Sequence, residues 1–221
     1  MNVRNRLISL ASRMISLGLL ATFFSFYVMG AGNPGAWICY YHVQSGIMLM
    51  GVFFLEIIAN AIDLRHGTRG FPAGLYMPIT LGVFFYAITS ALLYFAILVP
   101  SHPEERHLAG HIYVTLLLIL PVIDWLLFDE KGTLRWYFGF TFLAYPIFYA
   151  VFMLFRPYIF PNIALYSDGS AYPYWMLNPK DPLFPLYLGA WLVGLYALAM
   201  LLIFLNNLFG GKYRKRAIDL Y

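Results

Sequence analysis

The sequence has few charged residues and almost no cysteine. Charged side chains make up 11% of its 221 residues, whereas a soluble domain carries about 25%. With 62% hydrophobic residues and a mean hydropathy of +0.72, a soluble globular domain is excluded. The single Cys39 cannot form an intrachain disulfide, so we expect a small buried side chain there. The net charge of +4 does not indicate nucleic-acid binding, because no segment is long enough to form a water-exposed basic domain.

Long apolar stretches make up most of the sequence. A helix needs about 20 apolar residues to cross the hydrocarbon core of a bilayer, and six stretches reach or approach that length. They lie at 7–30, 37–62, 73–99, 109–128, 137–155 and 185–209. The sequence therefore predicts an all-α integral membrane protein, a six-helix transmembrane bundle formed by a single domain over residues 1–221. The segment 156–184 is the longest connection, and we expect it to form a structured outer loop.

The distribution of Lys and Arg predicts the orientation, because short cytoplasmic loops retain these residues. One side carries eleven of them, namely Arg4, Arg6, Arg13, Arg65, Arg69, Lys131, Arg135, Lys212, Arg214, Lys215 and Arg216. The other side carries three, namely Arg106, Arg156 and Lys180. Both termini are thus predicted to face the cytoplasm, and the first apolar stretch is interpreted as a retained helix rather than a signal peptide.

Among the ionisable residues within the predicted helices, we single out His42, Glu56, His111 and Asp124. Such a residue costs roughly 2.5–3.5 kcal/mol at the centre of a membrane helix, so each needs a partner or a function. Glu56 and Asp124 lie towards the cytoplasmic ends. We expect them to reach the interface or to pair with one of three arginines. These arginines are Arg65, Arg69 and Arg135.

His42 and Ser45 are three residues apart in the motif YYHVQSG (residues 40–46). This spacing places both side chains on one face of a helix, with their Cβ atoms roughly 5–6 Å apart. The pair could be a hydroxyl nucleophile and its base, although a packing pair is the commoner meaning. His111 begins the fourth stretch at a similar depth, so it could meet His42. Gln44 and Thr115 are candidate substrate-binding groups beside them.

A metal site is an alternative use of the histidines. His107 and His111 have the i, i+4 spacing that places two ligands on one helical face, and His42 would be a third ligand. In the outer loop, Tyr172, Tyr174 and Trp175 belong to an aromatic, proline-containing run. That run is predicted either to cover a ligand cavity or to anchor the loop at the membrane surface.

Two further segments carry a resemblance to a known family. Residues 124–156, DWLLFDEKGTLRWYFGFTFLAYPIFYAVFMLFR, and residues 172–178, YPYWMLN, resemble the androgen-induced-gene family of membrane proteins, especially its bacterial members. The run YAITSALLYFAIL at 86–98 is similar to the third helix of that family, and residues 40–46 to its second. The resemblance covers nearly the whole chain, with residues 124–178 the most specific part. It implies a bacterial inner-membrane location.

Characterised animal members of that family hydrolyse fatty-acid esters of hydroxy fatty acids, using an intramembrane Thr nucleophile and a His. The resemblance implies the same class of substrate here, an amphipathic acyl ester. This chain departs from the pattern, since His42 stands where the Thr is expected and Gly46 where an Asn is expected. Val114 stands at the position of the family His, three residues from His111.

Three hypotheses follow for the function. The first is intramembrane hydrolysis of an acyl-lipid ester by Ser45, His42 and His111, with no cofactor. The second is lipid binding without turnover, either alone or as an accessory subunit with a protein partner in a larger membrane complex. The third is a metal-bound water held by His42, His107 and His111. In each case we expect membrane lipid to be a partner of the protein, either as its ligand or as the bilayer around it.

Overall fold

The computed structural model describes residues 3–30, 36–103, 107–160 and 171–210. Within them the chain is all-helical, as predicted, and six helices are long and apolar enough to cross a membrane. The first two are α1 (Arg6–Gly30) and α2 (Tyr41–Asp63). The third is α3 (Met77–Leu93), which continues through a π-helical turn at Tyr94–Leu98 into α4 (Val99–Ser101). The others are α5 (Leu108–Leu127), α6 (Phe138–Phe142) followed directly by α7 (Ala144–Ile159), and α8 (Phe184–Phe209).

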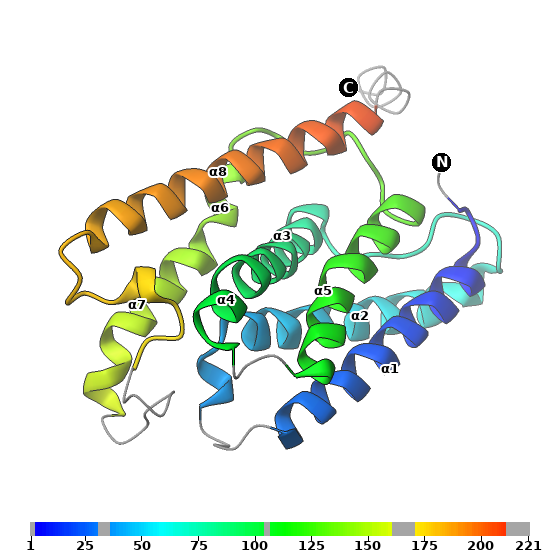
Figure 1. Cartoon of the computed structure of the whole chain (residues 1–221). Helices are drawn as coiled ribbons and strands as arrows, with labels where there is room; N and C mark the ends of the chain where they lie inside the picture. Colours follow the sequence, from blue (N-terminus) through cyan, green and yellow to red (C-terminus); the bar gives the residue numbers. More distant parts are fainter. Residues whose placement is uncertain (1–2, 31–35, 104–106, 161–170, 211–221) are drawn as a thin grey trace.

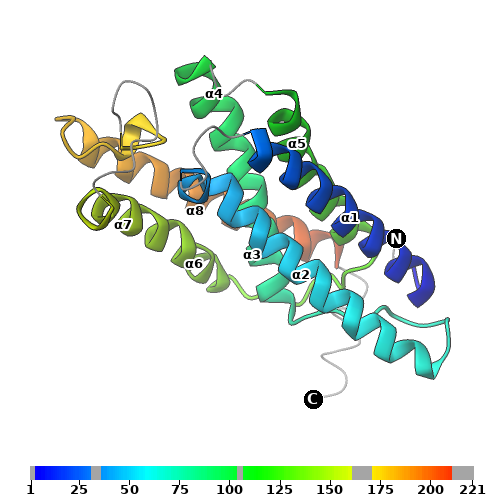
Figure 2. The ribbon, with the colours of Figure 1, turned by 90° about the horizontal axis from the view of Figure 1, so that it is seen from below.

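The third helix lies at the centre of the bundle. α1, α2, α3 and α5 pack on one another, whereas α6, α7 and α8 lie beyond α3 (Figures 1 and 2). In the most apolar stretch of the third helix, 67% of the residues are buried inside the protein. In the corresponding stretch of α8, only 17% are buried. Because apolar surface is stable in contact with lipid tails, the exposed faces of α8 suit a bilayer.

The helices connect at two ends of the bundle, and different loops form each end. The terminal end, as we call it, contains residues 3–6, 63–76, 128–137 and 207–210. It is joined by hydrogen bonds from the Val3 amide to the Leu127 carbonyl and from Asn207 Nδ2 to the Leu134 carbonyl. Among the described residues, the opposite end contains residues 36–40, 99–103, 107–108, 156–160 and 171–183. That the terminal end faces the cytoplasm stays a prediction from its excess of Lys and Arg.

The helix bounds agree with the predicted stretches to within about four residues, apart from one interruption. The fifth stretch is broken at Leu143, between α6 and α7. Pro146 explains the break, since a proline lacks an amide hydrogen and its ring clashes with the carbonyl four residues earlier. That carbonyl belongs to Phe142, the last residue of α6.

The outer loop is structured in the part that the structure describes. Arg156 is fully buried at the end of α7, and its Nη1 donates to the Ala171 carbonyl over 2.7 Å. A short 3-10 helix at Trp175–Leu177 buries Met176 and Leu177. Residues 161–170 lie outside the described residues. The described segment 171–183 therefore packs onto the bundle, and its position on the outer side of a membrane stays a prediction.

Candidate functional site

His42 lies in the first turn of α2, because the chain is extended at Tyr40 and becomes α-helical at Tyr41. Its side chain is completely buried. Four aromatic rings surround the imidazole. Their centroids lie 5.1 Å away for Tyr94, 5.3 Å for Tyr27, 5.4 Å for Tyr40 and 6.5 Å for Tyr113. The imidazole thus occupies an aromatic enclosure built by α1, the π-helical turn after α3, α5 and the residue before α2.

Neither ring nitrogen of His42 has a hydrogen-bond partner among the residues that the structure describes. A buried polar group without a partner costs about 1–3 kcal/mol. In a membrane helix an ionisable side chain in this position also points to a function. The imidazole of His42 therefore calls for a polar partner from outside the described chain, either water or a ligand.

Ser45 is also fully buried, one turn further along α2. Its Oγ donates to the backbone carbonyl of His42 over 3.3 Å rather than to the imidazole. A serine hydroxyl in a helix readily forms such a bond to a carbonyl in the preceding turn. To act as a nucleophile, Ser45 would first have to release this carbonyl and turn its hydroxyl towards a ring nitrogen.

Tyr94 joins His42 to His111. The π-helical turn that starts at Tyr94 carries its ring against both imidazoles, with centroid distances of 5.1 Å to His42 and 5.5 Å to His111. The Tyr94 hydroxyl lies 3.1 Å from His111 Nδ1, which is also 3.2 Å from the His107 carbonyl. π-Helical turns occur frequently at functional sites. We call His42, Tyr94, His111, Tyr27 and Tyr113 the histidine–tyrosine cluster.

The histidines do not form a metal-binding group. Within the described residues, no three His, Cys, Asp or Glu side chains are arranged to hold a metal ion. His107 is exposed and lies just before α5, where its carbonyl accepts the His111 amide. The three-histidine alternative therefore gains no geometric support.

The predicted substrate-binding residues Gln44 and Thr115 have other partners. Gln44 Nε2 donates to the Ile38 carbonyl over 2.8 Å, and its Oε1 accepts from the Tyr145 hydroxyl over 3.0 Å. Thr115 Oγ1 donates to the His111 carbonyl over 2.7 Å. Gln44 thus links α2 to α7, whereas Thr115 bonds to the backbone of the cluster.

The loop aromatics contact α7 and α8. Tyr174 is fully buried against Tyr149, at a centroid distance of 6.3 Å. Trp175 is 46% exposed and meets the ring of Tyr187 edge-on at 4.7 Å. Tyr172 is partly buried, and burial raises the pKa of its hydroxyl. Tyr174 and Trp175 therefore attach the loop to α7 and α8.

A second polar group lies towards the terminal end, and sequence reasoning missed its centre. Arg13 on α1 is 1% exposed. Its Nε and Nη2 donate to the two carboxylate oxygens of Asp124, each over 3.0 Å, and Nη1 donates to the Ala73 carbonyl over 2.9 Å. Glu56 Oε2 lies 3.1 Å from Nε, and Asp129 Oδ1 lies 3.4 Å from Nη2.

This arginine corrects the expected partners of Glu56 and Asp124. We expected them to reach the interface or to pair with loop arginines, but they pair with Arg13 inside the bundle. The position of Arg13 within the first apolar stretch was the available signal, since a charge inside a membrane helix normally has a partner. Arg13 therefore has a structural role besides its contribution to the predicted orientation.

Asp129 and Lys131 extend this group beyond the end of α5. Burial raises the pKa of the Asp129 carboxyl well above its usual range, and the nearby carboxylates of Asp124 and Glu56 raise it further, against the effect of Arg13. Burial lowers the pKa of the Lys131 ammonium. Lys131 Nζ donates to the carbonyls of Trp125, Leu126 and Asp129 over 2.9–3.2 Å.

Two of the positions at which the chain departs from the pattern of the resembling family, Val114 and Gly46, lie in packed surroundings. Val114 is completely buried. A Cβ atom added at Gly46 would overlap the hydroxyl of Tyr113, which donates to the His42 carbonyl over 3.3 Å. An Asn at position 46 would therefore not fit beside Tyr113. No protein family, no curated protein and no solved structure matches this chain in sequence or structure searches.

Proposed function

We propose that the protein binds an amphipathic acyl lipid within its membrane-spanning bundle, with the polar part of the lipid at the histidine–tyrosine cluster. The imidazole of His42 carries this proposal. It is completely buried, and both of its ring nitrogens lack a partner among the described residues. A polar group of the lipid would supply the missing hydrogen bonds.

The chemistry of a neutral imidazole limits which classes of ligand can bind to it. One ring nitrogen donates a hydrogen bond and the other accepts one. An ester group only accepts hydrogen bonds, whereas an acyl ester that also carries a free hydroxyl group offers both an acceptor and a donor. Such a lipid matches both nitrogens of His42, and its acyl chains can lie among apolar helix faces. The resemblance to the androgen-induced-gene family favours an amphipathic acyl ester.

The test compares lipids retained by the purified protein. We expect mass spectrometry of the wild-type protein to find a bound acyl lipid in about one-to-one ratio. His42→Phe keeps an aromatic ring but removes both nitrogens, so it should lose most of that lipid. The matched control is Tyr41→Phe, the neighbouring residue of α2, which is also completely buried and has an unbonded hydroxyl. Tyr41→Phe should retain the lipid.

Equal retention by His42→Phe and the wild type would contradict the proposal. In that case His42 is a packing residue, and His42→Phe should also unfold at the same or a higher temperature. Loss of lipid from both variants would show a general effect on packing and would contradict the assignment to His42. If the lipid is retained but never cleaved, the protein acts as a carrier, sensor or accessory subunit of a membrane complex.

Ester hydrolysis is the second candidate, favoured by the Ser45 hydroxyl one turn from the unbonded imidazole of His42. After its hydroxyl turns, Ser45 Oγ attacks the ester carbonyl carbon and His42 accepts the hydroxyl proton. The alcohol leaves with that proton, and water then cleaves the acyl-serine to release the acid. The contact between Tyr94 and His111 places a further hydroxyl and a further base at the same cluster.

Ser45→Ala tests the hydrolytic step. If Ser45 is the nucleophile, the variant should lose turnover of a fluorogenic acyl ester while its unfolding temperature changes little. Thr89→Ala is the control, because Thr89 is a buried hydroxyl residue on α3 whose Oγ1 has no hydrogen-bond partner in the described residues. Unchanged turnover in Ser45→Ala would exclude Ser45 as the nucleophile and leave lipid binding as the function.

A further inference from the structure

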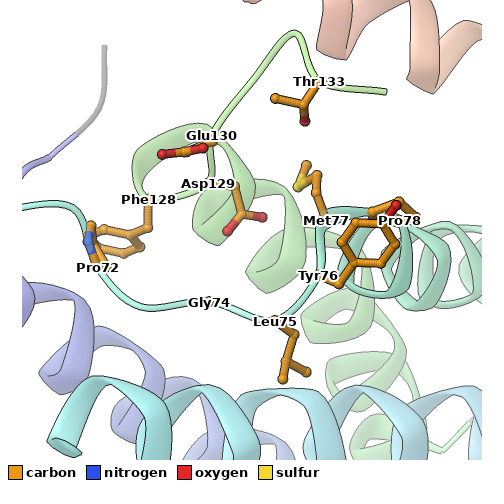
Figure 3. Close-up of a pocket in the computed structure, with 10 residues that line it drawn as sticks. All are labelled: Pro72, Gly74, Leu75, Tyr76, Met77, Pro78, Phe128, Asp129, Glu130 and Thr133. Atoms are coloured by element: carbon orange, nitrogen blue, oxygen red, sulfur yellow. The ribbon is translucent and has the colours of Figure 1, made fainter. Parts of the chain in front are cut away.

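A cavity of about 380 Å³ lies at the terminal end, far along the helices from the histidine–tyrosine cluster. It is enclosed by two loops, residues 72–78 before and at the start of α3 and residues 128–133 after α5 (Figure 3). The volume lies at the small end of the range for ligand sites, roughly 300–1,000 Å³. A small molecule or a lipid headgroup would fit it.

Carboxylates supply the charge of the cavity. Asp129 is 7% exposed, and its carboxylate is directed into the space between the loops (Figure 3), while Glu130 lines the cavity from an exposed position. Asp129 also contacts Arg13, so the buried ion group forms the back of the cavity.

The cations near the cavity are bonded to other groups. The Arg13 guanidinium donates to both oxygens of Asp124 and to the Ala73 carbonyl, and it contacts Glu56 as well. The Lys131 ammonium donates to three backbone carbonyls. One guanidinium therefore faces three buried carboxylates, and Glu130 adds a fourth at the cavity. When these four carboxylates are ionised, the cavity has an excess of negative charge even when Lys131 is included.

Aromatic rings form two other walls. Tyr76 and Phe128 line the cavity on either side of Asp129 (Figure 3). The face of an aromatic ring attracts a cation within about 6 Å of its centroid, and the Arg13 guanidinium already lies 5.9 Å from the centroid of Phe128. Carboxylates combined with aromatic rings favour an organic ammonium group. They disfavour a phosphate or a free carboxylate, which the acidic side chains repel.

We propose that this cavity binds an organic ammonium group, which Asp129 and Glu130 hold by charge and Tyr76 and Phe128 by their ring faces. The cavity lies where α3 begins and α5 ends, at the level of the membrane interface. Both a free amine and an amine-bearing lipid headgroup can reach that level. This site is independent of the proposed lipid at the histidine–tyrosine cluster.

The experiment uses the full-length protein purified in a maltoside detergent, which has no ammonium group. In the first arm, ethanolamine and tetramethylammonium are titrated while the unfolding temperature is recorded. In the second arm, the protein is placed in nanodiscs of phosphatidylethanolamine or of phosphatidylglycerol, and the unfolding temperatures are compared. We expect a rise in at least one arm. A response in the first arm identifies a free amine as a ligand, and a response in the second arm alone identifies a lipid headgroup.

Two variants locate the site. Glu130→Gln and Tyr76→Leu change exposed side chains, so both should fold. Each should weaken ammonium binding by about two- to fivefold, the size expected for one exposed charge or ring contact. The controls are Asp181→Asn at the opposite end and Tyr137→Leu, an exposed tyrosine at the terminal end that does not line the cavity. Both controls should bind like the wild type.

Three outcomes would overturn the proposal. The first is no response to either soluble amine and no difference between the two nanodiscs. The second is a response that Glu130→Gln and Tyr76→Leu leave unchanged. The third is stabilisation by Mg²⁺ or Ca²⁺ with none by the amines, which would show that the carboxylates recognise a metal ion rather than an ammonium group.

Discussion

Arg13 of α1 and Asp124 of α5 form a bidentate ion pair, with both nitrogen–oxygen distances at 3.0 Å and both side chains buried. Glu56 of α2 contacts the same guanidinium at 3.1 Å, so one side chain connects three of the four helices that pack together. Two fixed N–H groups of a guanidinium match the two oxygens of a carboxylate. A lysine at position 13 could not reproduce this arrangement.

Replacing Arg13 should therefore strongly destabilise the bundle. Arg13→Leu leaves Glu56 and Asp124 buried without their cation, which should cost about 3–5 kcal/mol of unfolding free energy. Arg13→Lys should restore only part of this loss. The control is Arg135→Leu, because Arg135 is exposed in the loop after α5 and should change stability by less than about 1 kcal/mol. Denaturation in mixed micelles gives the comparison, and equal stability of the two leucine variants would contradict the role of Arg13.

Gly46 offers a test of packing at the cluster. In Gly46→Ala the added methyl group overlaps the Tyr113 hydroxyl, so Tyr113 must shift and its bond to the His42 carbonyl must lengthen. Overpacking of this kind should cost about 1–3 kcal/mol. Gly51→Ala lies on the same helix with open space at its Cβ, and it should be neutral or stabilise by up to about 1 kcal/mol. A thermal shift in the same direction for both variants would argue against the close approach of Tyr113.

Tyr94→Phe removes the hydroxyl that meets His111 Nδ1 while keeping the ring between the two imidazoles. We expect a loss of about 0.5–1.5 kcal/mol, the net value of one hydrogen bond. The ¹⁵N resonances of the His111 ring should shift, whereas those of His66 in the loop after α2 should not. Tyr196→Phe, whose ring packs on Phe140, serves as the control. An unchanged His111 spectrum in Tyr94→Phe would show that the contact is not a hydrogen bond.

Ammonium binding at the terminal cavity should strengthen as the pH rises. Burial raises the pKa of Asp129 well above the ordinary 3.8, with Asp124 and Glu56 acting in the same direction and Arg13 and Lys131 opposing them. Asp129 therefore carries a proton over part of the range above pH 3.8, and only its ionised form attracts a cation. The same shift makes Asp129 reduce stability as the pH rises, because the folded state holds the proton more tightly than the unfolded state.

Titrations of tetramethylammonium at several pH values measure this effect, since that ligand has a fixed charge. The affinity of the wild type for tetramethylammonium should increase with pH. Asp129→Asn should bind more weakly, and its affinity should depend less on pH. A profile independent of pH in the wild type would contradict the participation of Asp129. Glu130→Gln should lower the affinity at all pH values without removing the slope.

The helices were largely predictable because the bilayer imposes one strong rule, a run of apolar residues about 20 long. The break at Leu143 is the main deviation, and its cause was visible as Pro146, although a proline early in a helix is often tolerated. The π-helical turn at Tyr94 had no recognisable signal in YAITSALLYFAIL. It nevertheless determines which side chain separates His42 from His111.

The candidate site was predictable only in part. His42 and His111 each contact the ring of Tyr94, whereas the expectation that the two histidines could meet stays a prediction. The spacing of His42 and Ser45 predicted a common face, but spacing does not determine where a hydroxyl points. Ser45 donates to the nearest backbone carbonyl. Catalysis, ligand and membrane orientation stay predictions. The role of Arg13 was not predictable from the sequence alone, because the positive-inside rule accounts equally well for an arginine at this position.

The pairing of Arg13 also bears on how the chain enters a membrane. Arg13 is synthesised 111 residues before Asp124, so the first helix emerges from the ribosome long before its bidentate partner exists. Glu56 on the second helix is the earliest carboxylate that can neutralise it. The first two helices should therefore enter the bilayer as a hairpin, and a chain truncated before Glu56 should insert its first helix less efficiently than one truncated after it.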